Sequence, residues 1–439
     1  MSTLQGEPTT LSPSAAHTES RPGGPRAWAA IACHTVVDYF QYLIIPLMPL
    51  LATRLDLTPG QKAAAIGIGG VASGVVQPGI AWLSDKLNTR WLGTLGLILA
   101  AISTSLVGYT ENYTQLLTIQ IISSMGIGAF HPVAAAAVGQ LYRSRRSLGV
   151  SLFFLGGMTG GIAGNLSAPT YVKYLGLHGL AWLIIPGLIA AAVLIASIHS
   201  VSHRSHTAHA EHAALSDHER RWRWIAVGVL YICAVIRFTV NAALVYLFID
   251  WCTKLTAARD HIDLQTATQA IQNQLGLKAS STNGLLQAAM QIGMGSAALA
   301  GGWLLNRGSE RRTLIILPIF GAATIALMPW AEHYFEHDGA RHFTIPAIFT
   351  LATLAGIGFG GLVPVTIALA QRLLPHRTSL ASGLMMGGAW AVAGIGPTLG
   401  EVFTRHLGSA QAYFCVAGLL LIGGLISTAI PGWLLRKLA

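Results

Sequence analysis

An apolar stretch near the N-terminus carries two side chains that can bind and release protons. His34 and Asp38 are four residues apart and Gln41 follows three later, so all three share one face of a helix. In the second half of the chain, Arg237 and Asn241 are again four apart. An imidazole beside a carboxylate can relay a proton. We therefore expect Asp38 and His34 to carry protons, and Arg237, Asn241 and Gln41 to contact a substrate.

Each of these charged groups lies in a segment with almost no other charge. An ionised side chain at the centre of a membrane helix costs about 2.5–3.5 kcal/mol, so it usually faces a cavity or a partner. Attraction between Asp38 and Arg237 across a cavity would explain why both charged side chains are tolerated within membrane-spanning segments. Arg237 then either attracts an anionic substrate or keeps Asp38 ionised until substrate displaces it. The competing interpretation is a structural pair that fixes helix packing.

Further candidates lie in other apolar segments. His131 precedes Pro132, which kinks a helix, so His131 either lines a cavity and relays protons or bonds to its own backbone. Gln287 and Gln291 are four apart and are predicted to line the substrate path. Glycine-rich segments contain Gly157 and Gly388, which we expect to allow close packing and, in addition, gating.

The elements that position these residues are indicated by composition. Of 439 residues, 53% are hydrophobic and only 10% are charged, and the mean hydropathy is +0.56. Soluble domains carry about 25% charged residues, so a soluble enzyme, a disordered chain and a secreted disulfide scaffold are excluded. Twelve apolar runs are long enough to cross a bilayer as helices: 27–52, 63–84, 91–109, 115–139, 147–172, 178–198, 224–250, 282–305, 313–331, 344–371, 379–404 and 410–434.

The basic residues predict the orientation. With both termini in the cytoplasm, 18 of the 27 Lys and Arg residues fall in inner segments and 8 in outer ones, as the positive-inside rule requires. The net charge of +10 is thus a topology signal, and no nucleic-acid partner is expected.

The two halves of the chain resemble each other. Residues 81–86 (AWLSDK) parallel 302–307 (GWLLNR) at an offset of 221. Such a 6+6 repeat predicts an all-α membrane protein of two six-helix bundles around a central site, hence a transporter. Charged residues at the inner ends of the helices are expected to form a gate, because weak surface ion pairs can open: Asp85, Arg90 and Arg146, with Asn306 and Arg311 in the second half.

The connecting segments complete the predicted organisation. Residues 1–26 form a disordered cytoplasmic tail, 27–198 the first bundle, 199–223 a His-rich cytoplasmic linker, and 224–439 the second bundle. The linker is either solvated chain or a metal-sensing segment. Within the second bundle, 251–280 is an outer insertion in which Leu264, Ile271 and Leu275 predict a surface helix.

No nucleophile–base pair, metal-ligand spacing or nucleotide loop is present, so an enzyme, a bound metal and a cofactor are not expected. The four cysteines are scattered and indicate packing positions.

Several motifs resemble a known family. Residues 81–90 are similar to the inner loop motif of the major facilitator superfamily, with Ala81 at its first Gly position. Stretches 34–41, 49–51, 77–78, 84–86, 128–132, 156–157, 374–375 and 382–384 look like the fosmidomycin resistance branch. The chain departs from that branch at Val133 (Glu in the family), Asn165 (Pro) and Arg237 (Lys), and in the 251–280 insertion and His-rich linker.

The resemblance implies a bacterial inner-membrane, multi-pass transporter of the major facilitator fold that exchanges protons for a drug-like compound. The residues support proton-coupled export of a small anionic or amphipathic molecule by a monomer in the lipid bilayer. The alternatives are proton-linked uptake or facilitated exchange of an organic anion and, from another class, a membrane metal sensor.

Overall fold

The computed structural model describes residues 24–84, 90–142, 146–198, 216–304, 310–337 and 340–438, and every regular element in them is helical. The first half contains α1 (Pro25–Gln41), α2 (Ile44–Arg54), α3 (Pro59–Ser84), α4 (Arg90–Ser105), α5 (Tyr113–Leu141), α6 (Arg146–Leu175) and α7 (Ile184–Ile198). The second half contains α9 (Asp217–Arg259), α10 (Gln269–Leu304), α11 (Glu310–His337), α12 (Thr344–Gly360), α13 (Leu362–Leu373), α14 (Thr378–Gly383), α15 (Ala389–Ala393), α16 (Gly396–Leu407), α17 (Ser409–Ser427) and α18 (Gly432–Leu438).

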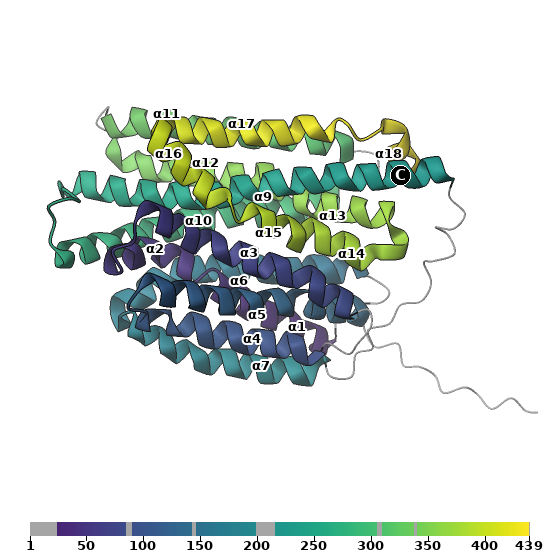
Figure 1. Ribbon diagram of the computed structural model, residues 1–439, viewed down its shortest axis with the longest axis horizontal. Coiled ribbons are helices and arrows are strands. Elements are labelled where there is room, and N and C mark those ends of the chain that lie inside the picture. The colour runs from purple at the N-terminus through teal and green to yellow at the C-terminus, as the bar shows by residue number, and fades with distance from the viewer. Residues whose placement is uncertain are drawn as a thin grey trace, which may run out of the picture.

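The helices pack as two bundles, stacked one above the other in Figure 1. In the first bundle, α1 packs against α5, α6 and α7, and α4 packs between α5 and α7. In the second, α9 packs against α15, α16 and α17, while α12 lies between α10 and α11. The bundles meet where α10 contacts α2 and α6, and where α3 contacts α15 and α16. This arrangement confirms the predicted all-helical, two-bundle membrane fold.

Three of the predicted spans are interrupted helices. Span 1 divides into α1 and α2 at Tyr42–Leu43, and span 10 divides into α12 and α13 at Gly361. Span 11 contains a π-helical turn, Leu384–Gly388, between α14 and α15. A π-helical turn leaves part of the normal hydrogen-bond ladder unmade and is often found at functional sites. The Tyr231 hydroxyl donates to the carbonyl of Gly388, the last residue of this turn, at 3.0 Å.

The predicted surface helix in the 251–280 insertion is wrong. α9 runs on to Arg259 and α10 begins at Gln269, so the insertion lengthens two membrane helices and leaves only a short connection between them. Leu275 is fully buried within α10, whereas Leu264 lies in the connection. α9 also begins at Asp217, earlier than the predicted inner end at residue 224, because Ser216 caps it by accepting from the Glu219 amide. Most of the predicted tail and linker lies outside the described residues.

Eleven of the described helical segments have the length and hydropathy of a membrane span. α10 is not among them although it has 36 residues. Its amide side chains lower its hydropathy, and Asn283, Gln287 and Gln291 are all at least 97% buried. Because α10 packs against α2, α6, α9 and α12, these groups face protein instead of lipid. It occupies the position of the eighth predicted span.

Candidate functional site

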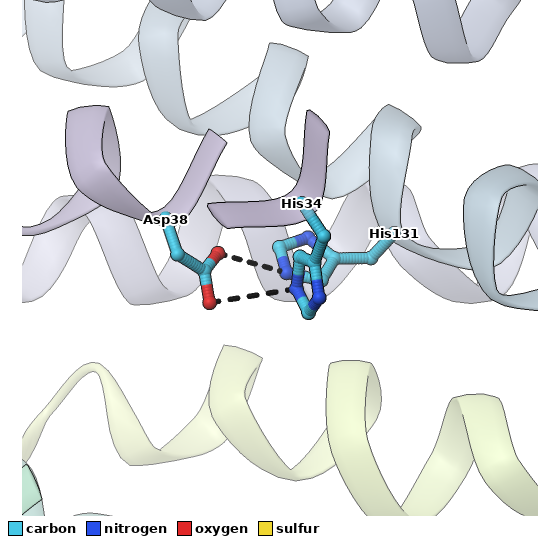
Figure 2. A group of neighbouring side chains, drawn as sticks. All are labelled: His34, Asp38 and His131. Carbon is cyan, nitrogen blue, oxygen red and sulfur yellow. Dashed lines mark ion pairs between the residues drawn. The ribbon is translucent and has the colours of Figure 1, made fainter. Parts of the chain in front are cut away.

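Two helices of the first bundle bring three ionisable side chains together. His34 and Asp38 lie one turn apart on α1, and His131 comes from α5 (Figure 2). His34 Nε2 lies 3.4 Å from Asp38 Oδ2, and His131 Nε2 lies 3.2 Å from Asp38 Oδ1. His34 and Asp38 are each only 4% exposed. We call these three residues the His–Asp–His cluster; its side chains point towards the side on which yellow-green helices of the second bundle pass.

The backbone fixes the orientation of both imidazole rings. His34 Nδ1 lies 2.6 Å from the carbonyl oxygen of Phe153, and the ring stacks on the Phe153 ring with centroids 3.7 Å apart. His131 Nδ1 lies 2.8 Å from the carbonyl oxygen of Ile127, one turn earlier on α5. The predicted bond of His131 to its own helix is therefore present, while its other nitrogen meets Asp38; the relay of protons by His131 stays a prediction.

These contacts determine which nitrogen carries hydrogen. A carbonyl oxygen can only accept, so Nδ1 of each ring must donate to it. In a neutral ring Nε2 then presents a lone pair, and in the cluster both Nε2 atoms face the Asp38 carboxylate. Without a further proton, two lone pairs would face an anion. A proton on Asp38 or on either Nε2 turns that repulsion into attraction, so the cluster is built to hold at least one exchangeable proton.

Gly157 on α6 gives the cluster its space. A Cβ atom at this position would lie 2.8 Å from His34 Nε2, and it would also meet Asp38 Oδ2. Such separations are well inside van der Waals contact, so only glycine fits here without a shift of the cluster. Gly157 was predicted as a gating residue, and the structure places it directly against the candidate proton site.

The predicted polar lining lies close to the contact between the bundles. Gln287 Nε2 donates to Asn283 Oδ1 at 3.0 Å, and Asn283 Nδ2 donates to the carbonyl of Ile45 at 3.0 Å. Gln41 Oε1 and Gln291 Oε1 are buried without a hydrogen-bond partner. Asn283 was not among the lining residues predicted from the sequence, although it continues the four-residue spacing of Gln287 and Gln291 by one turn.

Asn165 on α6 also lies at this contact and was noted only as a departure from the family pattern. It is fully buried, and both atoms of its amide lack a hydrogen-bond partner. A Cβ at Gly284 of α10 would contact the Asn165 backbone, which shows how closely α6 and α10 approach. Asn165 therefore adds a further buried amide to the contact between the bundles, besides those of α10.

The expected pair between Asp38 and Arg237 does not form. Within the described residues, the Arg237 guanidinium makes no ion pair and donates one hydrogen bond, from Nη1 to Thr366 Oγ1 at 3.3 Å. The group also lies over the Phe238 ring, 4.6 Å from its centroid. Asn241, one turn along α9, donates to the sulfur atoms of Met290 and Met294 at 3.6 and 3.8 Å. Asp38 is compensated instead by two histidines of its own bundle.

The predicted gating residues are only partly described. Asp85 and Asn306 lie outside the described residues, and Arg90 and Arg146 begin α4 and α6 with side chains outside the described part. Arg311 is exposed near the start of α11.

The two remaining gating candidates are Pro132 and Gly388. Pro132 lies within α5, immediately after His131. A Cβ at Gly388 would come no closer than 3.4 Å to Tyr231, which is an ordinary contact. Space alone therefore does not require glycine at position 388.

The cluster also has the composition of a metal site. His34, Asp38 and His131 each offer one ligand atom, and these atoms lie within 4.8 Å of one another. Two imidazoles and a carboxylate suit a divalent transition metal, although the sequence predicted none. A metal would need both Nε2 atoms and the carboxylate free of protons, so a metal and a proton would exclude each other here.

Comparison with known proteins agrees with this architecture. The Major Facilitator Superfamily model matches residues 30–331 and 264–437. The chain is 24% identical over 394 residues to the fosmidomycin resistance protein of Escherichia coli K12, covering 89% of each. It is 22% identical over 386 residues to the cyanate transport protein CynX of the same organism, covering 86% of this chain and 90% of the relative. An uncharacterised transporter of Bacillus subtilis, YfnC, is 20% identical over 403 residues, covering 89% of each chain. With two bundles of membrane helices and a family match along nearly all its length, the chain belongs to the Major Facilitator Superfamily and is a membrane transporter.

Proposed function

We propose that this protein exports a small anionic or amphipathic compound in exchange for protons, by alternating access of its two bundles. It is a multi-pass protein of the bacterial inner membrane with both termini in the cytoplasm, and it works as a monomer. Protons bind at Asp38, assisted by His34 and His131. The compound binds between the bundles, where Gln41, Gln287 and Gln291 supply polar contacts.

The observation that carries this proposal is the His–Asp–His cluster. Two imidazoles whose Nδ1 atoms donate to backbone carbonyls both present Nε2 to one buried carboxylate. Of the possible occupants, a proton best relieves that arrangement. The distances from the two Nε2 atoms to the Asp38 oxygens, 3.2 and 3.4 Å, exceed those of strong charge-assisted hydrogen bonds, about 2.7–2.9 Å. The bound proton is therefore held weakly enough to exchange.

Contacts between the bundles support an alternating mechanism. At the predicted outer end, Lys62 of α3 pairs with Asp250 of α9 at 3.4 Å. Gln269 of α10 donates to the carbonyl of Thr53 on α2 at 2.7 Å. These links join one bundle to the other and must break when the outer side opens. At the inner end, Asp85, Arg90, Arg146, Asn306 and Arg311 are the proposed counterpart, with Pro132 and Gly388 as flexible points.

The substrate class is inferred from the charge of the second bundle and from the relatives. Arg237 is a buried cation whose Nε and Nη2 have no partner, and it attracts anions. One relative is named for resistance to fosmidomycin, a phosphonate, and another for transport of cyanate, also an anion. The cyanate relative supports the second candidate, which is proton-linked uptake or facilitated exchange of an organic anion.

The direct test uses purified protein in liposomes that contain a pH-sensitive dye. Fosmidomycin and a panel of organic anions are added under an imposed pH gradient, and proton movement is recorded. Asp38→Asn should abolish substrate-dependent proton flux and leave the folded protein intact. Asp260→Asn is the matched control, because Asp260 lies in the outer connection and pairs with Lys278 at 2.6 Å.

The outcomes separate the candidates. Coupled flux that persists in Asp38→Asn removes the cluster from the proton role. Labelled substrate that equilibrates without proton movement identifies a facilitator, and Val133, where the family has Glu, then explains the loss of coupling. A metal sensor would lose its response when residues 200–218 are deleted, whereas a transporter keeps its flux.

A further inference from the structure

Two buried atoms of the His–Asp–His cluster have no hydrogen-bond partner. His34 Nε2 and Asp38 Oδ1 take part in no hydrogen bond, although each lies within 3.4 Å of an ionisable neighbour. Such atoms are rare in a protein interior, because a buried polar group without a partner costs free energy. The side chains are therefore close enough to interact but are not aligned on one another, as expected when they are directed at a shared point between them.

The distances within the cluster match those between the ligands of one metal ion. Zinc binds histidine nitrogen at about 2.0–2.1 Å and carboxylate oxygen at about 2.0–2.2 Å, so two such ligands at the tetrahedral angle are about 3.3–3.5 Å apart. One Nε2 lies beside each oxygen of Asp38, at 3.4 Å for His34 and 3.2 Å for His131. The ligand atoms of the three residues lie within 4.8 Å of one another, so a shift of roughly 1 Å closes them around an ion.

The backbone holds both imidazole rings in the way that a metal site requires. Metal-binding histidines almost always donate their other ring nitrogen to a carboxylate or a backbone carbonyl, which fixes the tautomer and leaves a lone pair for the metal. His34 Nδ1 makes this bond with the Phe153 carbonyl at 2.6 Å, and His131 Nδ1 makes it with the Ile127 carbonyl at 2.8 Å. Within the part of the chain that the structure describes, no other three His, Cys, Asp or Glu side chains come together in this way.

The cluster can be reached from the side of the second bundle. The His131 side chain is 17% exposed, and the three side chains point towards the side on which helices of the second bundle pass (Figure 2). On the side of α6, Gly157 places no Cβ against His34 and Asp38. An ion that enters between the bundles therefore meets the two lone pairs and the carboxylate together.

We propose that the His–Asp–His cluster binds a divalent transition metal ion, with zinc as the probe, and that the bound ion arrests transport. The ion is an inhibitor, because it needs the same three groups free of protons that must take up the exchanged proton. The binding needs only the folded protein, whereas the arrest rests on the proposed proton-coupled export.

Binding is measured on the purified full-length protein in detergent, prepared without a polyhistidine tag. Histidines of the linker would also bind zinc, so five of them are first replaced by glutamine: His199, His203, His206, His209 and His212. Calorimetry measures zinc binding, and cobalt(II) serves as a second probe because its visible absorption reports coordination geometry. One ion per chain is expected, and magnesium should not compete, because it prefers oxygen ligands.

Substitutions assign the ion to this site. His131→Gln and Asp38→Asn each remove a ligand and should weaken zinc binding by more than about 100-fold, since even the loss of a supporting group costs about 10- to 100-fold. His406→Gln is the matched control, because His406 is exposed near the end of α16 and lies outside the cluster. It should leave zinc binding unchanged.

The arrest is measured with the linker-substituted protein in liposomes. Zinc at ten times its Kd leaves about a tenth of the sites free and should lower substrate-dependent proton flux about tenfold. Removal of zinc with EDTA should restore the flux. Zinc that binds but leaves the flux unchanged, or raises it, would overturn the arrest. A protein that binds zinc at the cluster but shows no coupled flux without metal would refute proton-coupled export alone.

Absence of stoichiometric zinc and cobalt binding by the linker-substituted protein would overturn the proposal, even if no variant of the cluster can be purified. Binding of full affinity in both His131→Gln and Asp38→Asn would also overturn it, because the ion would then lie elsewhere in the protein.

Discussion

Replacement of Gly157 by alanine tests whether the geometry of the His–Asp–His cluster is essential. The added Cβ would lie 2.5 Å from His34 Cε1, whereas non-bonded heavy atoms prefer about 3.5–4.0 Å, so the ring must move by at least about 1 Å. His34 cannot move freely, because its Nδ1 is bonded to the Phe153 carbonyl at 2.6 Å and its ring stacks on Phe153. A 1 Å shift directed along that bond would stretch it to about 3.6 Å, beyond hydrogen-bond range.

The size of the effect follows from this conflict. Overpacking of a well-packed site costs about 1–3 kcal/mol, which corresponds to about 5- to 150-fold in an equilibrium constant. We expect Gly157→Ala to lower substrate-dependent proton flux in liposomes by at least about tenfold, the equivalent of about 1.4 kcal/mol. A smaller loss of thermal stability should accompany it, since part of the strain is relieved by movement of the cluster.

Gly295 is the matched control for this substitution. A Cβ at Gly295 would lie 3.4 Å from Met158, which is an ordinary contact. Gly295→Ala should therefore keep flux within about twofold of the wild type, as neutral substitutions do. Wild-type flux and stability in Gly157→Ala, or an equal loss in both variants, would refute the reasoning.

The remaining predictions concern the outer contact and the occupant of the cluster. Lys62→Gln removes the mostly buried ion pair with Asp250 and should destabilise the outer-closed state by about 1 kcal/mol. In a background without the four native cysteines, reaction of a Thr53→Cys thiol with an impermeant reagent should then become several-fold faster; an unchanged rate would show that the pair does not hold the bundles together. Treatment with EDTA should leave coupled flux within about twofold of its untreated value, because the cluster binds protons and needs no metal. Flux that is lost on chelation and restored by zinc would instead identify the cluster as a metal site.

Much of the fold could be predicted from the sequence because the same physical constraint applies to every membrane-spanning segment. A helix in a bilayer must satisfy its own backbone, so length and apolar composition located each span. The exceptions have local causes. α10 was located from residue 282 onwards, but its outer part, which includes Gln272 and Lys278, was too polar to be recognised as part of a span and was predicted to be a separate surface helix. Its position against the neighbouring helices α2 and α9 protects it from lipid, and that protection cannot be seen in its own sequence.

The sequence was sufficient to predict which residues belong to the candidate site, but it did not predict which of their side chains contact one another. Spacing placed His34 and Asp38 on one face of a helix, and a buried histidine before proline singled out His131. The proximity of His131 to Asp38 depends on how α5 packs against α1, which single-helix periodicity does not encode. The same limit produced the incorrect pair of Asp38 with Arg237. Charge alone suggested that pair, whereas packing gave each residue different neighbours.

The polarity of α10 has a consequence for how the protein is made. A helix that carries Asn283, Gln287 and Gln291 along its length enters lipid poorly when it emerges alone from the ribosome. Besides a bond within the helix, from Gln287 to Asn283, its amides donate to chain made earlier in synthesis: Gln287 to the Val245 carbonyl of α9 and Asn283 to the Ile45 carbonyl of the first bundle. The order of synthesis therefore sets the order of folding. The first bundle must be assembled before the eighth span can be retained in the membrane.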